Sequence, residues 1–276
     1  MSSDTLLSKL AFKVARVAES AGNLVHQNYT TAERLSLVGA RRPNRQQANV
    51  LNYRVSFLSE NAYQLLLREI FFKREYQFEE KIDSPVILDC GANIGMATLF
   101  FKRLYPNARV SCFEADPTTA GVLQKNVEQN HLDHVTVYNL LLGNKEGDCP
   151  FYTGSGQPGM LSMSANPDRV SNHREIIVKA GKLSQYIDSP VDLLKLDVEG
   201  AEWEVMDDLK SSGKISQIRR MVIEYHHRIG GQASRLSKFL LLLEEEGFEY
   251  QIAASGCDPI TRQGVYQDIL IGAYRT

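Results

Sequence analysis

Two glycines and two acids between positions 89 and 114 form the clearest chemical pattern in the chain. The run VILDCGANIGMATLFF, residues 86–101, is apolar as far as Asp89, turns through Gly91 and Gly95, and continues with helical apolar spacing. Glycines at such a turn let the backbone approach a ligand, and the helix that follows points free N–H groups at it. Glu114 ends the next apolar run, VSCFEADP, where a carboxylate can accept hydrogen bonds from both ribose hydroxyls. This pattern predicts a loop that binds a nucleotide cofactor.

The spacing of these residues indicates which kind of nucleotide is bound. A pyrophosphate-binding turn needs three glycines as G-x-G-x-x-G, whereas GANIG has two and follows Asp89. An acid at this place repels a pyrophosphate but suits a cofactor with a cationic end and a single ribose. S-adenosylmethionine has an ammonium and a sulfonium, so we expect it as cofactor and S-adenosylhomocysteine as product. The methionine end is assigned to Asp89, Gly91, Asn93 and Gly95, the ribose to Glu114, and the adenine edge to Asn139 and Leu140.

Acids and histidines follow two later apolar runs, LLKLD and VIEYHH. The carboxyl ends of parallel strands meet at one crevice, so Asp197 is expected to face the cofactor together with Asp89. A methyl sulfonium is a good electrophile, and the protein must align the nucleophile and accept its proton. The candidates for accepting that proton are Asp197, Glu199, Glu202, Glu224, His226 and His227.

His226 is the residue we expect to act as general base. Residues two apart in a strand share a face, so Glu224 and His226 are expected to act together, one orienting the other. Mg²⁺ bound by Asp197, Glu199 and His226 is a rival use of the same side chains. No tight ligand spacing supports it, and we expect no metal.

The elements that position these residues belong to two parts of the chain, with a boundary near Ser84 and Pro85. Residues 5–28 and 60–78 have helical apolar spacing, with a polar, arginine-rich loop between them. From Val86, strands and helices alternate over 86–89, 95–104, 109–113, 117–130 and 135–140, which predicts a parallel sheet with right-handed crossovers. We expect residues 1–84 to be a helical extension that covers the crevice and residues 85–276 to be the cofactor-binding domain.

The second half of the chain is less regular. Residues 148–185 are expected to form an inserted loop with a short strand near 175–178, and Met160, Ser162, Met163 and Ser164 are expected to form a second wall of the crevice. Strands are expected at VDLLKLD, RRMVIEY, 248–253 and YQDILIGAY, with a helix that ends at Gly247.

Length, composition and net charge limit the further classes of protein to which the chain can belong. With 276 residues, 43% of them apolar, the chain can bury one α/β core with an appendage. A formal charge of -2 argues against a broad nucleic-acid surface, and Arg41, Arg42 and Arg45 are expected in a solvated loop. The cysteines at 90, 112, 149 and 257 lack C-x-x-C spacing. Without an apolar secretion signal or a membrane-spanning run, a cytoplasmic location is expected.

Four separated blocks resemble the FkbM-type methyltransferases, within the class I S-adenosylmethionine-dependent methyltransferases. They are DCGANIG at 89–95, FEADP at 113–117, LKLDVEGAEWEV at 194–205 and IEYH at 223–226, within a similarity over about residues 60–255. Cys90 stands where the family often has valine or isoleucine, and Ala115 lies within the acidic block. The resemblance implies a Rossmann-like α/β fold with a mostly parallel, seven-stranded sheet and helices on both faces.

The same resemblance implies methyl transfer to an oxygen of a sugar or glycan, a polyketide or another small acceptor. It also adds Ala92, Ala115 and Tyr76 to the cofactor site, since EIFFKREYQF resembles the segment before the glycine loop in that family. A dinucleotide-dependent oxidoreductase and a non-catalytic, partner-binding protein on the same fold remain alternatives. Nucleic-acid methylation is not supported by a basic surface or an Asn-Pro-Pro-Tyr block. The oligomeric state stays open, with a homodimer as one possibility.

Overall fold

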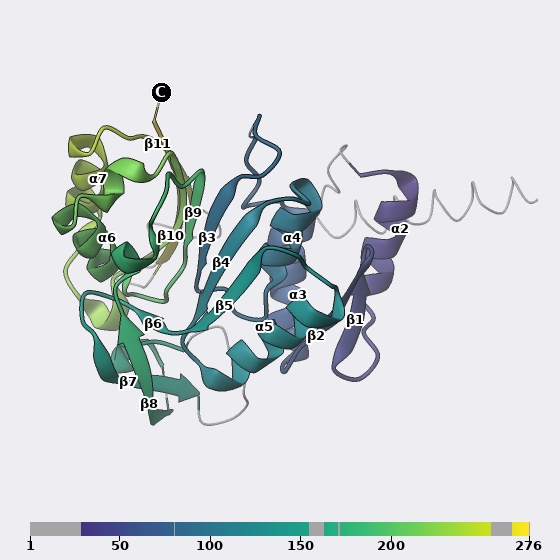
Figure 1. Cartoon of the computed structure of the whole chain (residues 1–276). Helices are drawn as coiled ribbons and strands as arrows, with labels where there is room; N and C mark the ends of the chain where they lie inside the picture. The colour runs from purple at the N-terminus through teal and green to yellow at the C-terminus, as the bar shows by residue number, and fades with distance from the viewer. Residues whose placement is uncertain (1–28, 80, 155–162, 171, 255–266, 276) are drawn as a thin grey trace, which may run out of the picture.

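The computed structural model describes residues 29–79, 81–154, 163–170, 172–254 and 267–275. A seven-stranded sheet lies at its centre, in the order β11-β12-β10-β9-β3-β4-β5 (Figure 1). Neighbouring strands from β10 to β5 are parallel, whereas β12 is antiparallel to both β10 and β11. The strands are β3 (Val86–Cys90), β4 (Arg109–Glu114), β5 (Val135–Asn139), β9 (Leu193–Leu196), β10 (Arg220–His227), β11 (Glu249–Ala254) and β12 (Gln267–Tyr274). The expected mostly parallel, seven-stranded sheet is confirmed.

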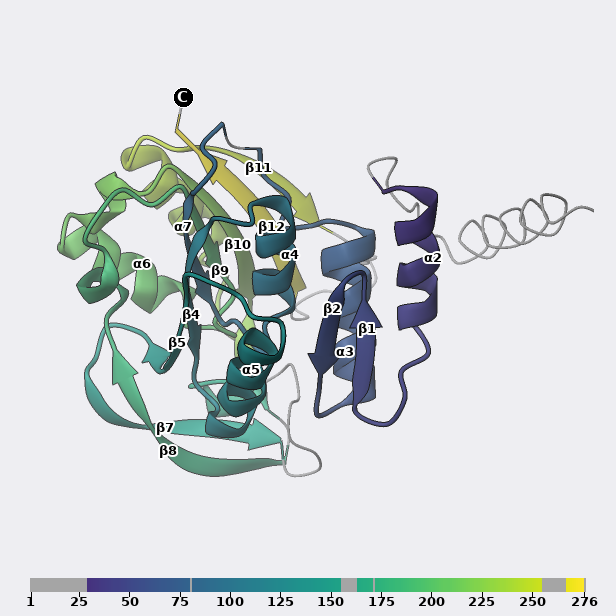
Figure 2. The same cartoon turned by 45° about the vertical axis from the view of Figure 1, so that its right-hand side comes forward.

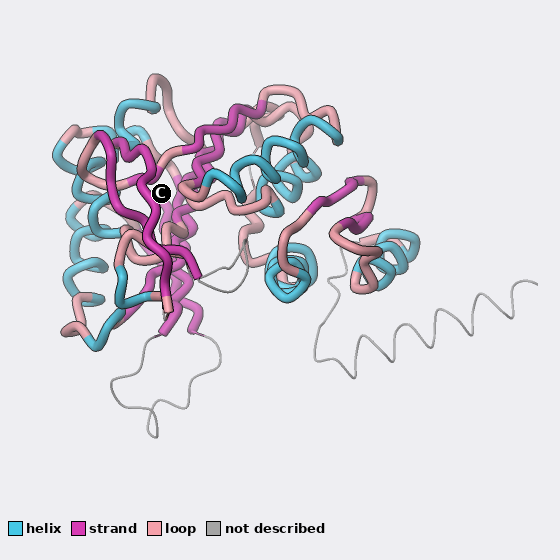
Figure 3. The backbone as a smooth tube through the Cα atoms, turned by 90° about the horizontal axis from the view of Figure 1, so that it is seen from below, coloured by secondary structure: helices cyan, strands magenta, loops and turns pink. Residues whose placement is uncertain are grey.

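Helices cover both faces of this sheet, as Figure 3 shows from below. On one face α4 (Met96–Leu104) and α5 (Pro117–Gln129) contribute to one apolar core, which includes Phe100 and Leu123. On the other face α6 (Glu202–Ser211) and α7 (Leu236–Glu245) contribute to a second core, which includes Met206 and Phe239. All four residues of β9 are buried, as expected of a strand covered on both faces.

The order in which successive strands are added to the sheet reverses at β3. Strands β4 and β5 follow β3 on one side, and β9 and β10 lie on the other. Between strands that leave in opposite directions, the loops at their carboxyl ends separate and leave a crevice. The ends of β3 and β9 therefore define where a ligand binds.

The N-terminal extension differs from its prediction. Where the arginine-rich loop was expected, the structure has α2 (Thr31–Ala40) and a hairpin of β1 (Gln47–Val50) and β2 (Tyr53–Ser56), which lie beside α3 (Glu60–Leu66) in Figure 2. The second predicted helix continues from α3 as a π-helix, η1 (Leu67–Phe72), and ends six residues before 78. The helix expected at 5–28 lies outside the described residues.

Asn126 of α5 fixes the hairpin to the central domain. Its side chain accepts a hydrogen bond from the Ser56 amide at 2.7 Å and donates to the Ser56 carbonyl at 2.9 Å. The extension therefore shares a core with the sheet and its helices, and its aromatic residues Tyr63, Phe71 and Phe72 are buried in that core.

A second sheet replaces most of the inserted loop expected at 148–185. It contains β6 (Leu141–Leu142), β7 (Gly147–Gly154) and β8 (His173–Gly181), in the order β6-β8-β7. The expected short strand near 175–178 is part of β8, which is longer than predicted. Short 3-10 helices complete the described elements: η2 (Pro167–Arg169), η3 (Leu183–Tyr186), η4 (Lys214–Gln217) and η5 (Ile229–Gly231). None of the helices in the described ranges has both the length and the apolar character needed to cross a membrane.

Candidate active site

The glycine loop connects β3 to α4. Gly91 has φ 76°, and the amides of Gly91 and Ala92 both donate to the Phe113 carbonyl at 2.9 Å. A Cβ on Gly91 would lie 1.7 Å from the Asp197 carbonyl oxygen, so this glycine lets the ends of β3 and β9 meet. Gly95, with φ 87°, is the N-cap of α4, and a Cβ there would lie 2.5 Å from Leu123 Cδ1. Gly91 is therefore required by the approach of the Asp197 backbone, and Gly95 is favoured by its left-handed φ.

A hollow lies at this loop, and eight of the residues expected to bind the cofactor line it. They are Tyr76, Gly91, Ala92, Asn93, Glu114, Ala115, Leu140 and Asp197. Apolar walls are added by Leu66 and Ile70 from the N-terminal extension and by Phe151 and Met163 from beside the second sheet. The hollow measures about 80 Å³, which is less than the range of about 300–1,000 Å³ typical of ligand pockets. Its lining nevertheless brings most of the residues expected to bind the cofactor together at the end of β3.

Three of the residues expected to touch the cofactor lie outside the walls of this hollow. Asp89 is fully buried, accepts a hydrogen bond from Thr98 Oγ1 at 2.7 Å and lies 3.6 Å from Lys195 Nζ. The side chain of Asn139 donates to the carbonyls of Glu114 and Ala115 at 2.9 Å, and so joins the ends of β5 and β4. Gly95 caps α4. These residues support the hollow without lining it.

Lys195 is a buried residue of the hollow that the sequence analysis missed. Its Nζ donates to the Gly91 carbonyl at 2.6 Å and lies 3.2 Å from Asp197 Oδ2. Burial lowers the pKa of Lys195, but the charges of Asp197 and Asp89 outweigh burial and raise that pKa above its ordinary value. The lysine ammonium thus occupies the acceptors that were assigned to the methionine end. A lysine inside the apolar run LLKLD was the available signal.

Glu114 sits at the edge of the hollow, held by backbone amides. Its Oε2 accepts from the Asn93 amide and its Oε1 from the Asp116 amide, both at 2.9 Å. Burial raises the pKa of Glu114 to about 7, although the two amides lower it. Each oxygen keeps a second lone pair, so the carboxylate can still accept ribose hydroxyls.

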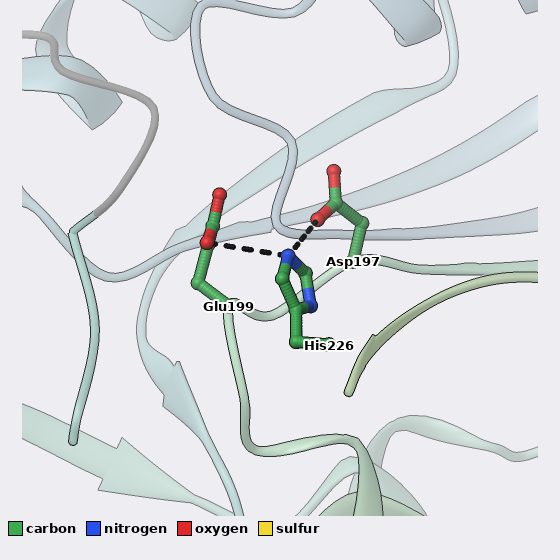
Figure 4. Close-up of side chains that lie close together, drawn as sticks. All are labelled: Asp197, Glu199 and His226. Carbon is green, nitrogen blue, oxygen red and sulfur yellow. Dashed lines mark ion pairs between the residues drawn. The ribbon is translucent and has the colours of Figure 1, made fainter. Parts of the chain in front are cut away.

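His226 lies at the centre of a cluster of acids beyond the end of β9, shown in Figure 4. Its Nε2 lies 3.2 Å from Glu199 Oε2 and 3.9 Å from Asp197 Oδ1, and its Nδ1 lies 2.8 Å from Glu202 Oε1. Burial lowers the pKa of His226, but the charges of Glu202 and Glu199 outweigh burial, and that pKa lies well above its ordinary value. The ring of His226 is thus held by carboxylates on both of its nitrogen atoms.

Glu202, and not Glu224, orients the ring of His226. Glu202 opens α6 and also accepts the Gly200 amide at 2.9 Å, which places its carboxylate against Nδ1. The Glu224 carboxylate instead lies 3.4 Å from the Tyr76 hydroxyl. The charge of Asp197, together with burial, raises the pKa of Glu224 to about 9, so Glu224 is protonated at neutral pH. His227 is buried, and its lowered pKa reflects burial and the nearby Arg228.

The cluster also contains groups that can ligate a metal. One ligand atom each from Asp197, Glu199 and His226 lie within 4.8 Å of one another, as do those of Glu224, His226 and Asp268. Glu202 contacts the ring nitrogen of His226 that faces away from the other acids. A histidine that binds a metal commonly has such a carboxylate at its second nitrogen, and so does a histidine that acts as a catalytic base. The geometry therefore allows both a base mechanism and a metal-assisted one.

The fold and the site can now be compared with known proteins. The Methyltransferase FkbM domain model matches residues 89–250, which include the glycine loop, Glu114, His226 and every acid of its cluster except Asp268. The chain belongs to the FkbM methyltransferase family. It is accordingly an S-adenosylmethionine-dependent methyltransferase.

Curated relatives carry the same activity in their names. Methyltransferase 1 of Beauveria bassiana (strain ARSEF 2860) is 30% identical over 202 residues, which cover 66% of this chain and 79% of the relative. The 2-O-methyltransferase NoeI of Sinorhizobium fredii (strain NBRC 101917 / NGR234) is 28% identical over 162 residues, 53% of this chain and 65% of NoeI. A solved methyltransferase FkbM from Methylobacillus flagellatus KT aligns with a TM-score of 0.47 and 17% identity, covering 71% of this chain and 45% of that chain.

Proposed function

We propose that this FkbM methyltransferase transfers the methyl group of S-adenosylmethionine to a hydroxyl of a small-molecule, sugar or glycan, or polyketide-like acceptor. One observation carries the proposal: the turn from Asp197 to Glu202 joins the hollow at the glycine loop to the His226 cluster. Asp197 and Glu199 line the hollow, and Glu199 also contacts His226. A carboxylate and a histidine beside the cofactor are suited to accept a hydroxyl proton, and one relative is named a 2-O-methyltransferase.

The residues of the hollow fit the parts of this cofactor. Glu114 would hold the ribose hydroxyls, and Ala115, Leu140 and Val198 would lie against the adenine. The Gly91 loop and Asp197, which Lys195 ties together, would border the methionine end. S-adenosylmethionine supplies an electrophilic methyl group when it is bound there.

The His226 cluster would manage the proton of the acceptor hydroxyl. Above its raised pKa, His226 presents a neutral Nε2 that can accept this proton, while Glu202 holds Nδ1–H and stabilises the imidazolium that results. Leu66, Ile70 and Tyr76 of the N-terminal extension would cover the crevice and exclude water, in keeping with their place along the hollow.

Methyl transfer from radiolabelled S-adenosylmethionine to a panel of sugars, hydroxy acids and polyketide alcohols tests the function directly. We expect label in an ether or ester oxygen position of at least one member, located by mass spectrometry. Label on nitrogen or carbon alone would overturn the O-methyl assignment. NAD that binds more tightly than S-adenosylmethionine in a calorimetric titration would instead support the oxidoreductase alternative.

Glu114→Ala is expected to weaken S-adenosylmethionine binding by about 2 kcal/mol, because the variant loses a charged acceptor for two ribose hydroxyls. Since burial raises the pKa of Glu114 to about 7, its carboxylate is ionised above that pH and protonated below it. Wild-type affinity should therefore fall between pH 8 and pH 6, and the variant should lack this part of the pH dependence. Isothermal titration calorimetry across this range measures both effects. An unchanged affinity in a folded variant would exclude the ribose role.

A further inference from the structure

A second cavity, of about 480 Å³, adjoins the catalytic cluster. The first half of the Asp197–Glu202 turn lines the cofactor hollow, and the second half, Gly200 to Glu202, lines this cavity. Leu141 and Leu142 line both spaces, and His226 lines the second one. The volume lies within the range of about 300–1,000 Å³ found for small-molecule sites. The cavity is thus large enough for an organic molecule that touches His226.

The aromatic wall of this cavity is held in place by polar contacts. Trp203 Nε1 donates to the Tyr225 hydroxyl at 3.2 Å, and the Arg235 guanidinium lies 4.1 Å from the centre of the Trp203 ring. Trp203 also packs edge-on against Phe239 of α7, with ring centroids 5.3 Å apart. This side of the cavity is therefore rigid, which favours a preformed binding site.

The charges that face the cavity are mainly positive. Lys145, Arg228 and Arg235 line it, against Glu202 and Glu204. Glu202 is engaged by the Gly200 amide and by His226. An anion would therefore enter a site whose wall carries more cations than acids.

Arg228 combines two unusual features at the wall of this cavity. It follows β10 directly and has φ 64°, a left-handed conformation that is uncommon for residues other than glycine. Its Nε is buried without a hydrogen-bond partner among the described residues. A buried, unsatisfied donor on a charged group is costly, and such local strain clusters at ligand-binding sites. Arg228 also lines the cavity, where its guanidinium can pair with acceptor oxygens of a ligand.

We propose that this cavity binds the methyl acceptor, and that the acceptor is a hydroxylated organic anion whose charged group pairs with Arg228. The planar guanidinium matches the geometry of a carboxylate or a phosphate. A hydroxyl on the same molecule would face His226, whose Nε2 is 3.2 Å from Glu199 at the edge of the cofactor hollow. This inference rests on the proposed function, because it assigns the acceptor of the same reaction.

Calorimetric titration of the full chain with matched probes tests the preference for an anion. The probes are 3-hydroxybenzoate, 3-hydroxybenzamide and 3-hydroxyphenyl phosphate, with glucuronate and glucose as a second pair. The wild-type chain is expected to bind at least one anion about 10- to 100-fold more tightly than its neutral partner, the range for a hydrogen-bonded charged pair. The benzoate and phosphate arms show which anionic group is preferred. Equal binding of anions and neutral partners, or no binding of any probe, would overturn the proposal.

Arg228→Gly separates binding from folding. Glycine adopts the left-handed conformation without strain, so the variant should unfold at the wild-type temperature or above it, yet lose the preference for anions. Arg174→Gln removes the same charge from an exposed position on β8 and should keep that preference. An Arg228→Gly variant that retains the anion preference would contradict the assignment.

Parallel titrations with S-adenosylmethionine distinguish this inference from the proposed function. Anion binding that depends on Arg228, in a chain that does not bind S-adenosylmethionine, would remove the proposed function and leave an anion site. If the chain binds the cofactor normally and methylates neutral acceptors on oxygen but shows no preference for anions, the anionic acceptor is refuted and the proposed function stands.

Discussion

Gly91→Val is expected to abolish S-adenosylmethionine binding. A Cβ at this position would lie 1.7 Å from the Asp197 carbonyl oxygen, so a valine must push the end of β9 away from the glycine loop. The φ of 76° also belongs to a region that β-branched residues avoid. Displacement of Asp197 would break its contact with Lys195 and deform the hollow at its centre. Calorimetry on the purified variant measures the loss of binding.

Gly121→Val provides a matched control for this substitution. Gly121 lies within α5, and nothing comes within 4 Å of a Cβ placed there. The control should bind the cofactor with wild-type affinity and keep its helix, because valine has a higher helix propensity than glycine. Circular dichroism verifies that both variants are folded before affinities are compared. Wild-type affinity in a folded Gly91→Val chain would show that the cofactor binds elsewhere.

The regular part of the fold was predictable because its signals are local. Strands β3, β4 and β5 lie within one residue of their predicted bounds, since a short apolar run that ends at a glycine or a polar residue marks a strand. The β1–β2 hairpin was missed because it is short and polar, and it depends on contacts such as Ser56 with Asn126, 70 positions apart. The second sheet was not predictable for a similar reason, because buried and exposed residues do not alternate regularly along β7 and β8.

The position of the candidate site was predictable from local sequence signals, but the side-chain contacts within it were not. Glycines and strand-end acids predicted where the hollow lies, because their positions follow from the sheet. Which acid contacts which base did not follow, because the choice of Glu202 over Glu224 depends on how α6 begins. Lys195 was overlooked because a buried ammonium is stable only through partners such as Asp89, more than 100 positions away.

His226→Ala is expected to lower turnover by about 10²-fold or more, the usual cost of losing a general base, while cofactor affinity stays nearly unchanged. His226 contacts Glu199, Asp197 and Glu202 but does not line the cofactor hollow, which is why binding and turnover should separate. Single-turnover methyl transfer and calorimetry measure the two quantities. His173→Ala, at an exposed position on β8, is the matched control and should keep full activity.

The pH profile tests the role of His226 as a base. Because the pKa of His226 lies above its ordinary value, the imidazole becomes a base at a higher pH than an exposed histidine does. The acid limb of kcat should therefore have its midpoint above the ordinary histidine value. Glu202→Gln removes the charge that raises this pKa most, so the limb should move to lower pH. A limb that stays in place would exclude His226 as the titrating group.

A metal mechanism would give different results with the same proteins. If Asp197, Glu199 and His226 held Mg²⁺, a chelator would abolish turnover, and added Mg²⁺ would restore it. The base mechanism instead requires that activity survive the chelator and that Mg²⁺ give no stimulation. Glu199→Gln sharpens the distinction, because it removes a ligand in the first case but only lowers the His226 pKa in the second. A fully active His226→Ala enzyme would leave Asp197 or Glu199 as the base, since both lie at the edge of the cofactor hollow.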